Sequence, residues 1–375
     1  MAGDNESAVR FGIMGCAGIA RKVSRAIRLS PAARLTAVAS RSAEKARQFA
    51  AENEFPEDAR AYGSYEELLD DPAVDAVYVP LPTSLHRQWV AAAARKGKHV
   101  LVEKPAALDA AELEEMLGEC ESNGVQFMDG TMWMHHPRTA RMKSLLNDAA
   151  QFGDLRWIHT SSTFHGNQYF LENDIRVKPD LDGLGALGDT GWYCIRAILW
   201  AFNYQLPKRV TALPGTVFNK DGVILACGSS MDWNDGRLAT FYCSFLSHTS
   251  MDLSLHGSNG CLQLKDFIIP FQESSASFLL SANVGLNELH TGWTSKPKEF
   301  EVVNELPQEA LLIEEFSRLV RAIRSSGSPP DPMWPDICLK NQLVLDAVKK
   351  SIEQGCKSVE LGNMKSSMSL GTNSR

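Results

Sequence analysis

Three residues that could carry acid–base chemistry stand in two short motifs of the 375-residue chain. Lys104 lies in "EKPAA", directly after an apolar run that we expect to be a strand. Asp189 and Tyr193 lie in "GLGALGDTGWYC", and their spacing places them on one face of a helix. Together, an ammonium, a carboxylate and a phenol could move a proton to or from a substrate hydroxyl. The structural alternative is an exposed lysine, a charge at a helix start and a core tyrosine.

A glycine turn near the N-terminus could hold a dinucleotide. The stretch "RFGIMGCAGIA" reads as a strand, a tight turn and a helix start. A phosphate needs backbone N–H donors at a helix N-terminus, and glycines give it clearance. Two positions of the dinucleotide fingerprint are met, whereas an alanine replaces the middle glycine and a glycine follows it. The predicted cofactor loop comprises Gly15, Ala17, Gly18, Ile19 and Ala20.

The end of the second predicted strand indicates which nicotinamide nucleotide fits. An NAD site usually has Asp or Glu about 20 residues after the turn, where it holds the ribose hydroxyls. Here that place reads Ser40-Arg41, and Lys45 follows. A hydroxyl and two cations suit a 2′-phosphate, and no carboxylate is there to repel it. We therefore predict NADP rather than NAD, the alternative being that Arg41 and Lys45 are solvated charges.

The elements that must position these residues follow from the hydrophobic pattern. In the first third of the chain, apolar strands alternate with helical segments, which is typical of a parallel sheet covered on both faces. Ser84 is expected to cap one of these helices. The pattern predicts an α/β fold with a doubly wound N-terminal domain. The predicted strands read "VRFGIM", "LTAVAS", "VDAVYVP", "KHVLVE" and "VQFMDG".

The pattern changes after Pro137. Longer strands follow with Gly, Asn and Asp turns, and two of these turns, "NDG" and "SNG", are typical of tight hairpins. One helix follows the second motif, and two more are predicted near residues 310–324 and 336–353. An antiparallel sheet and an α+β second domain result. We place the domains at 1–135 and 136–363, with flexible segments at 1–8 and 364–375.

Composition restricts partners and location. The net charge of −7 argues against nucleic-acid and membrane-surface partners, since both attract cations. We find neither a signal-peptide pattern nor an apolar run long enough to cross a bilayer. The eight cysteines form no C-x-x-C pair, so we expect free thiols in the cytoplasm and predict no metal site.

Four motifs in order, "GCAGIA", "VYVPLPTSLH", "EKPAA" and "GLGALGDTGWY", carry a family resemblance. From about Val9 to Leu361 the chain resembles the glucose-fructose oxidoreductase / inositol dehydrogenase / MocA family. The resemblance implies an N-terminal Rossmann domain and a C-terminal α+β domain with a large, mostly antiparallel, open-faced sheet. It also implies a homodimer formed through that sheet, and hydride transfer between NAD(P) and a sugar, polyol or diol.

The resemblance also implies roles for single residues. Lys104 matches the catalytic lysine, Asp189 the conserved acid, and Tyr193 the His-or-Tyr position. A tyrosine there resembles the branch with glucose-fructose oxidoreductase, dihydrodiol dehydrogenase and NADP xylose dehydrogenase. Met134, in "MWMHHP", stands where many members have arginine. Positions that line the cofactor are matched by Leu81, Pro82, His86, Glu103 and Lys104, and 2′-phosphate contacts by Ser40 and Lys45.

The resulting hypothesis is an NADP-dependent oxidoreductase acting on a small-molecule alcohol or carbonyl. Tyr193 would transfer the proton while Lys104 orients the substrate oxygen, and the reversed assignment stays open. Asp189 would bind substrate hydroxyls or Lys104. Two other functions remain: a non-catalytic NADP(H)-binding regulator, and a reductase of another substrate class. Candidate pocket residues, which could equally be packing, are Trp133, His135 and His165.

Overall fold

The structure is a computed structural model that describes residues 8–363, and its first layer is a parallel sheet. Its strands are β1 (Val9–Met14), β2 (Ala33–Ala39), β3 (Arg60–Tyr62), β4 (Ala76–Val79), β5 (His99–Val102) and β6 (Phe127–Asp129). They lie in the order β3-β2-β1-β4-β5-β6, and every neighbouring pair is parallel. The apolar strands β4 and β5 are buried throughout, because helices cover both faces of the sheet.

Helices connect these strands. They are α1 (Gly18–Leu29), α2 (Ala43–Glu52), α3 (Tyr65–Asp70), α4 (His86–Arg95) and α5 (Ala110–Ser122). The side chains of Ser42, Ser64 and Asp109 accept N–H bonds in the first turns of α2, α3 and α5. The expectation that Ser84 caps α4 is wrong, because residues Thr83–Leu85 form a 3₁₀ turn that leads directly into the helix.

The second layer is a ten-stranded sheet. Its strands are β7 (Leu155–His165), β8 (Arg209–Ala212), β9 (Val217–Phe218), β10 (Ile224–Asp232), β11 (Leu238–Ser244), β12 (Leu246–Gly257), β13 (Gly260–Leu264), β14 (Ser275–Ala282), β15 (Lys298–Val303) and β16 (Val359–Glu360). They follow the order β15-β14-β13-β12-β7-β11-β10-β8-β16, with β9 on β10. Only β7 and β11 pair in parallel within this sheet. The predicted "NDG" and "SNG" hairpins are confirmed as the β10–β11 and β12–β13 connections.

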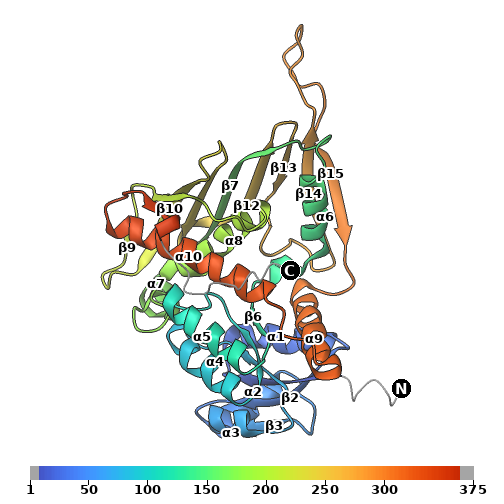
Figure 1. Ribbon diagram of the computed structural model, residues 1–375, viewed down its shortest axis with the longest axis vertical. Coiled ribbons are helices and arrows are strands. Elements are labelled where there is room, and N and C mark those ends of the chain that lie inside the picture. The colour runs from blue at the N-terminus through green and yellow to red at the C-terminus, as the bar shows by residue number, and fades with distance from the viewer. Residues whose placement is uncertain (1–7, 364–375) are drawn as a thin grey trace, which may run out of the picture.

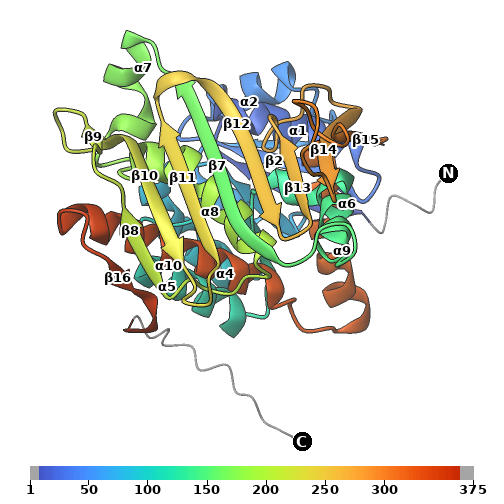
Figure 2. The same ribbon diagram turned by 90° about the horizontal axis from the view of Figure 1, so that it is seen from above.

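Helices lie between the two sheets (Figure 1). The remaining helices are α6 (Pro137–Leu146), α7 (Gln168–Asn173), α8 (Trp192–Ala201), α9 (Gln308–Ser326) and α10 (Met333–Glu353). Every residue of α8 is buried, and α10 packs on α5, α8, β6 and β8. The other face of the ten-stranded sheet lies open, as the view from above shows (Figure 2). The predicted late helices are confirmed as α9 and α10.

Helix α9 returns the chain to the first layer. It packs on α1, β1 and β2, and the aromatic rings of Phe11 and Phe316 join one core there.

The predicted boundary between residues 135 and 136 stays a prediction. Of the predicted flexible segments, 1–8 and 364–375, only Ala8 is described, and it is buried. No helix within residues 8–363 is both long and apolar enough to cross a bilayer.

Candidate active site

Lys104 lies at the carboxyl edge of the parallel sheet, two residues after β5 ends. In doubly wound sheets this edge is where ligands bind. The Lys104–Pro105 peptide is cis. The side chain of Lys104 is 10% exposed, so its ammonium lies in a nearly closed space.

Glycines allow the motif "GLGALGDTGWYC" to pack closely against the motif "EKPAA". Residues Leu187–Gly191 form a π-helical turn that continues into α8. A Cβ on Gly188 would lie 2.5 Å from Leu184 Cβ and 3.2 Å from Pro105 Cγ. A Cβ on Gly191 would lie 3.2 Å from the sulfur of Cys243 in β11. Because these positions lack side chains, the turn packs closely between the "EKPAA" segment and the second sheet.

The π-helical turn and the start of α8 place Asp189 and Tyr193 beside Lys104. The Lys104 ammonium donates to Asp189 Oδ1 and, at 3.2 Å, to the Asp189 carbonyl. The same ammonium lies 4.8 Å from the centre of the Tyr193 ring. The Tyr193 hydroxyl donates to the sulfur of Met132 at 3.7 Å. The three residues chosen from sequence therefore form one cluster.

Arg176 is a fourth member that the sequence analysis missed. Its Nε lies 3.2 Å from Asp189 Oδ1, and its Nη1 lies 3.0 Å from Asp174 Oδ1. Asp174 also accepts the backbone N–H of Arg176, which fixes the short 3₁₀ turn Ile175–Val177. Asp189 is thus shared between two cations. The only sequence signal for Arg176 is a cation between two acidic residues, Asp174 and Asp180, and that pattern is not specific.

The Lys104–Asp189 pair is charged. Burial alone would lower the pKa of Lys104, but Asp189 outweighs it and holds the pKa above its usual value. Burial would raise the pKa of Asp189, but Lys104 and Arg176 outweigh it and hold the pKa below its usual value. Burial also raises the pKa of Tyr193 above its usual value, and Lys104 opposes this only in part. The free chain therefore carries a protonated Tyr193 at neutral pH.

The glycine turn fits a dinucleotide phosphate. Gly15 has φ +115°, a conformation that favours glycine, and a Cβ there would lie 3.0 Å from Leu81 Cδ2. Helix α1 begins at Gly18 without a side-chain cap, so its first N–H groups are left for a ligand. A Cβ built on exposed Gly18 would meet no atom within 4 Å. Clearance therefore exists at Gly18, next to the half-buried Ala17.

The predicted 2′-phosphate residues lie beside this turn. Because β1 pairs with β2, the end of β2 brings Ser40 close to Gly15, whose N–H donates to Ala39. Ser40 is buried, whereas Arg41 and Lys45 are exposed. The sulfur of Cys16 lies 3.8 Å from the carbonyl oxygen of Lys45. The loop after β1 and the start of α2 thus form one cationic edge.

Comparison with known proteins gives a family match for the N-terminal part of the chain and another for the C-terminal part. Residues 9–131 match the model of an oxidoreductase family with an NAD-binding Rossmann fold, and residues 139–263 match the GFO/IDH/MocA C-terminal domain. An uncharacterized oxidoreductase of Rhizobium meliloti is 32% identical over 350 residues, which cover 92% of this chain and 98% of that protein. The chain belongs to the GFO/IDH/MocA family of oxidoreductases.

Two other similar proteins are named for an activity, and one of them was solved with ligands. The chain is 38% identical over 237 residues to D-xylose 1-dehydrogenase (NADP(+)) 2 of Haloferax volcanii, covering 63% of this chain and 69% of that protein. It is also similar to the crystal structure of a 3-ketoreductase from Actinomadura kijaniata in complex with NADP and TDP-benzene. The TM-score is 0.76 at 27% identity, covering 92% of this chain and 98% of that one. The predicted Rossmann domain and mostly antiparallel second sheet are confirmed.

In this GFO/IDH/MocA chain, His86 joins two loops at the sheet edge. Its Nε2 lies 2.8 Å from the carbonyl oxygen of Leu81, and its Nδ1 lies 3.0 Å from that of Ala106. The ring is buried, and burial lowers its pKa. His86 thus holds the Leu81–Pro82 segment against the loop that follows Lys104. Both segments were predicted to line the cofactor.

The predicted pocket residues of this family member differ in their surroundings, although Trp133 and His135 lie in one 3₁₀ turn, Met132–His135. Trp133 is buried in the core, with its ring edge-on to Trp200 and Phe267. The ring of His135 stacks on Trp334 at 4.8 Å. His165 is exposed at the end of β7. These contacts place Trp133 and His135 in packing, whereas Met132, which the sequence analysis passed over, contacts Tyr193.

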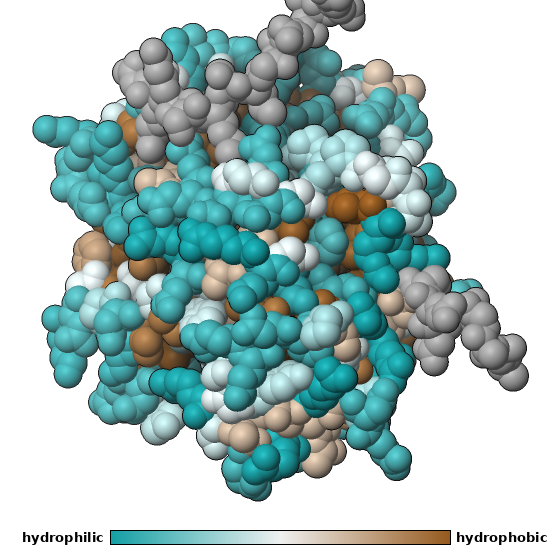
Figure 3. Space-filling view, turned by 60° about the horizontal axis from the view of Figure 1, so that its bottom comes forward, coloured by the Kyte–Doolittle hydropathy of each residue, from teal (hydrophilic) through white to brown (hydrophobic). Residues whose placement is uncertain are grey.

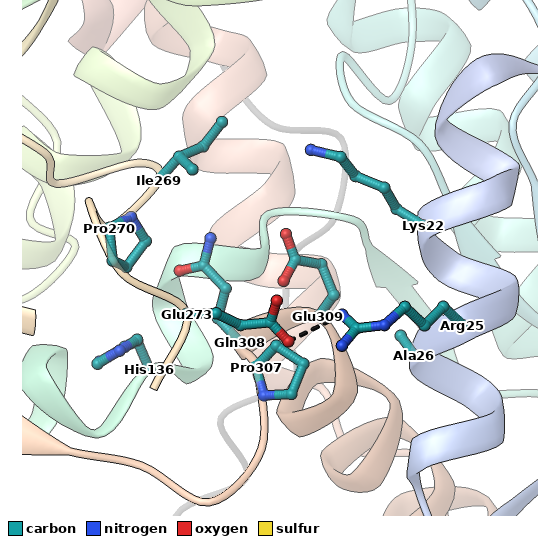
Figure 4. Close-up of a pocket in the computed structure, with 10 residues that line it drawn as sticks. All are labelled: Lys22, Arg25, Ala26, His136, Ile269, Pro270, Glu273, Pro307, Gln308 and Glu309. Carbon is teal, nitrogen blue, oxygen red and sulfur yellow. Dashed lines mark hydrogen bonds and ion pairs between the residues drawn. The ribbon is translucent and has the colours of Figure 1, made fainter. Parts of the chain in front are cut away.

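A separate cavity of about 270 Å³ lies between α1, the start of α9 and the loop after β13 (Figure 4). Arg25 of α1 pairs with Glu273 of that loop at 2.8 Å across one side. The residues that line the cavity are Lys22, Arg25, Ala26, His136, Ile269, Pro270, Glu273, Pro307, Gln308 and Glu309. None of them belongs to the Lys104 cluster, so this cavity is separate from the predicted acid–base residues.

Proposed function

We propose that the chain is an NADP-dependent oxidoreductase that interconverts an alcohol and a carbonyl of a sugar, polyol or diol. The observation that carries the proposal is the Lys104–Asp189–Tyr193 cluster at the carboxyl edge of the Rossmann sheet. Bound NADP(H) supplies the hydride acceptor or donor. The glycine turn, α1 and the Ser40–Lys45 edge would hold it, and the cations there favour a 2′-phosphate.

Tyr193 is the proton-transfer group in this proposal. Its hydroxyl has only a weak acceptor, the sulfur of Met132, so it is free to bond to a substrate oxygen. Lys104 lies beside the ring as a fixed cation, and it would orient the substrate oxygen and stabilise negative charge on it. Asp189 holds the lysine in that place. Because Tyr193 is protonated in the free chain, it is ready to donate a proton to a carbonyl.

The second sheet supports a proposal about assembly. We infer that two copies of the chain pair through its open face (Figure 2). On that face Trp157 is 39% exposed, stacks on His256 at 4.5 Å and lies opposite Leu238. Tyr242 is 40% exposed on the neighbouring strand. A row of exposed aromatic and aliphatic side chains on a flat sheet is typical of an interface.

The opposite side of the molecule offers a contrast. Figure 3, with the first sheet brought forward, shows a mostly hydrophilic surface on which hydrophobic residues form small, separate patches. Small apolar patches of this kind are ordinary for a soluble surface. The open sheet is therefore the better candidate for self-association.

Single-turnover hydride transfer tests the proposed reaction. The purified chain is first denatured to identify released nucleotide, then aldoses, inositols and diols are screened with NADP⁺ and NAD⁺. Tyr193→Phe and Lys104→Ala are each expected to slow the transfer by about 100-fold or more. Tyr204→Phe is the matched control, because the Tyr204 hydroxyl also donates to a methionine sulfur, that of Met134, at 3.8 Å.

Near-normal rates of hydride transfer in both Tyr193→Phe and Lys104→Ala would contradict the proposed roles of these two residues. Tight NADP binding without turnover of any alcohol or carbonyl would contradict the proposed function itself. The control Tyr204→Phe should retain the wild-type rate, since its hydroxyl bonds away from the Lys104 cluster.

A further inference from the structure

A buried hydrogen bond between a phenol and a carboxylate lies next to Lys104. Tyr78 is in the centre of the first sheet, fully buried on β4, where it pairs with Ile13 of β1 and Leu101 of β5. A hydroxyl buried in a core needs a hydrogen-bond partner within the fold. That partner is Glu103, whose Oε1 accepts the Tyr78 hydroxyl at 2.5 Å.

The carboxylate of Glu103 is held from a second side by the chain itself. Its Oε2 accepts the backbone N–H of Lys104 at 3.2 Å. Gly130, after β6, leaves the room for it, because a Cβ there would lie 2.9 Å from Glu103 Oε1. The Tyr78 hydroxyl, the Lys104 N–H and the backbone at Gly130 therefore enclose one carboxylate. Through that carboxylate, the backbone of Lys104 is tied to the rigid centre of β4.

We propose that Tyr78 and Glu103 are a positioning pair, which fixes the backbone of Lys104 while Asp189 fixes its ammonium. A lysine side chain has many rotamers, and anchoring both of its ends leaves it few. Catalysis by a positioned charge loses much of its effect when that charge is displaced by about 1 Å. The inference rests on the proposed function, because Lys104 needs a fixed place only if it orients a substrate oxygen.

The pair also contributes charge to the site. Glu103 faces Tyr78, Lys104 and Asp129, and Tyr193 faces Lys104, Glu103, Asp189, Arg176 and Tyr78. Burial raises the pKa of Glu103, while the bond from Tyr78 and the Lys104 cation lower it. The Glu103 carboxylate in turn raises the pKa of Tyr193. Replacing Glu103 by a neutral residue should therefore lower the pKa of Tyr193.

Amide hydrogen exchange tests the positioning without relying on activity. In Tyr78→Phe the exchange of the Lys104 amide is expected to rise about 10-fold, because its acceptor loses the bond that holds it. The adjoining Pro105 has no amide, which simplifies the assignment of that peptide. Tyr62→Phe is the matched control: its hydroxyl donates to another carboxylate, Asp71, at 2.9 Å on the outer strand β3. The control should leave the Lys104 amide unchanged.

Kinetics of the holoenzyme give the second readout. In Tyr78→Phe we expect kcat to fall about 10-fold while KM changes less than about 2-fold, since binding groups are untouched. In Glu103→Gln, the amide keeps the shape but loses the charge. The limb of the pH profile that reports Tyr193 deprotonation should therefore move to lower pH.

The possible results of these experiments test the positioning role and the proposed function separately. Unchanged exchange of the Lys104 amide in Tyr78→Phe overturns the positioning role, whatever the activity. Equal exchange gains in Tyr78→Phe and Tyr62→Phe also overturn it, because the effect would then be general loosening. If no alcohol or carbonyl is turned over by the wild type, the proposed function fails, and exchange still decides whether Tyr78 and Glu103 hold Lys104.

Discussion

Asp189 is shared between two cations, and both of them act on Tyr193. Its Oδ1 accepts from Lys104 and lies 3.2 Å from Arg176 Nε. Lys104 and Arg176 lower the pKa of Tyr193, whereas the carboxylates of Glu103 and Asp189 raise it. Arg176 therefore acts on Tyr193 through the field as well as through Asp189.

Arg176→Gln should change the pH profile in a defined direction. Arg176 lowers the pKa of Tyr193, so its removal should raise that pKa further. In the proposed reaction alcohol oxidation needs the deprotonated tyrosine, so the rising limb of its pH profile should move to higher pH. Arg176→Lys, which keeps the charge, is the control and should move the limb less. A limb that stays in place in Arg176→Gln, measured as kcat/KM against pH, would contradict this reading.

Three histidines, of which His99 and His136 are buried and His135 is half-buried, predict how stability depends on pH. Burial lowers the pKa values of His99, His135 and His136 to about 4 in the folded chain, against about 6.5 when unfolded. Between these values the unfolded chain binds more protons, so stability falls as pH falls from about 6.5 to 4. Asp346 opposes this, because burial raises its folded pKa to about 6.

Denaturant unfolding at pH 7 and pH 5 measures the balance. We expect the free energy of unfolding to drop by roughly 3–4 kcal/mol, three histidines outweighing one carboxyl. His135→Phe keeps an aromatic ring against Trp334 and removes one titrating group, so its drop should be smaller. A stability that is flat between the two pH values would show that these histidines are protonated in the fold.

Among the elements, the segment that leads into the π-helical turn is tightly constrained at Gly185. Gly185 has φ +58°, and a Cβ there would lie 2.0 Å from the carbonyl oxygen of Ile224. Gly185→Ala is expected to lower the free energy of unfolding by about 3 kcal/mol or more, from backbone strain and the clash together. Gly222→Ala, with φ +81° and open space around it, should cost only about 1 kcal/mol. Equal losses of unfolding free energy in Gly185→Ala and Gly222→Ala, measured with guanidinium, would show that the clash at Gly185 contributes nothing.

The local parts of the site could be predicted from sequence, and the long-range parts could not. Asp189 and Tyr193 share a helix face, so their spacing alone placed them together. The strand before Lys104 predicted its place at the sheet edge, whereas its catalytic role was implied by the family resemblance. Arg176 was missed because it lies in an irregular turn, where no periodicity indicates direction. Trp133 was taken as a pocket candidate, since an aromatic residue looks the same in sequence whether it faces a ligand or a core.

The same limit applies to the strands. Both layers and most helices follow from hydrophobic periodicity, and the two hairpins follow from their turn residues. The parallel pairing of β7 with β11 has no such local signal, because it joins segments far apart in the chain. The return of α9 to the first layer is also non-local. Such pairings are selected by the burial of whole faces rather than by neighbouring residues.

For the whole molecule, self-association through the open sheet can be tested by changing one side chain. Trp157→Arg would place a cation in the proposed interface, and we expect the dimer to dissociate at micromolar concentration. Sedimentation velocity measures the change. Phe271→Arg is the control, since Phe271 is 82% exposed away from the sheet strands. A wild-type chain that sediments as a monomer would contradict the dimer directly.

The parallel pair β7–β11 has a consequence for how the protein folds. Parallel neighbours cannot be joined by a tight turn, so the chain between them makes a long crossover. That crossover carries Arg176, Asp189 and Tyr193, and it leaves β7 after His165 and enters β11 at Leu238, which pairs with Trp157. Closing so long a loop costs entropy before any strand contact repays it, which makes such steps slow. Local helices can form early, whereas we expect the Lys104–Asp189–Tyr193 cluster to form late, when the long crossover closes.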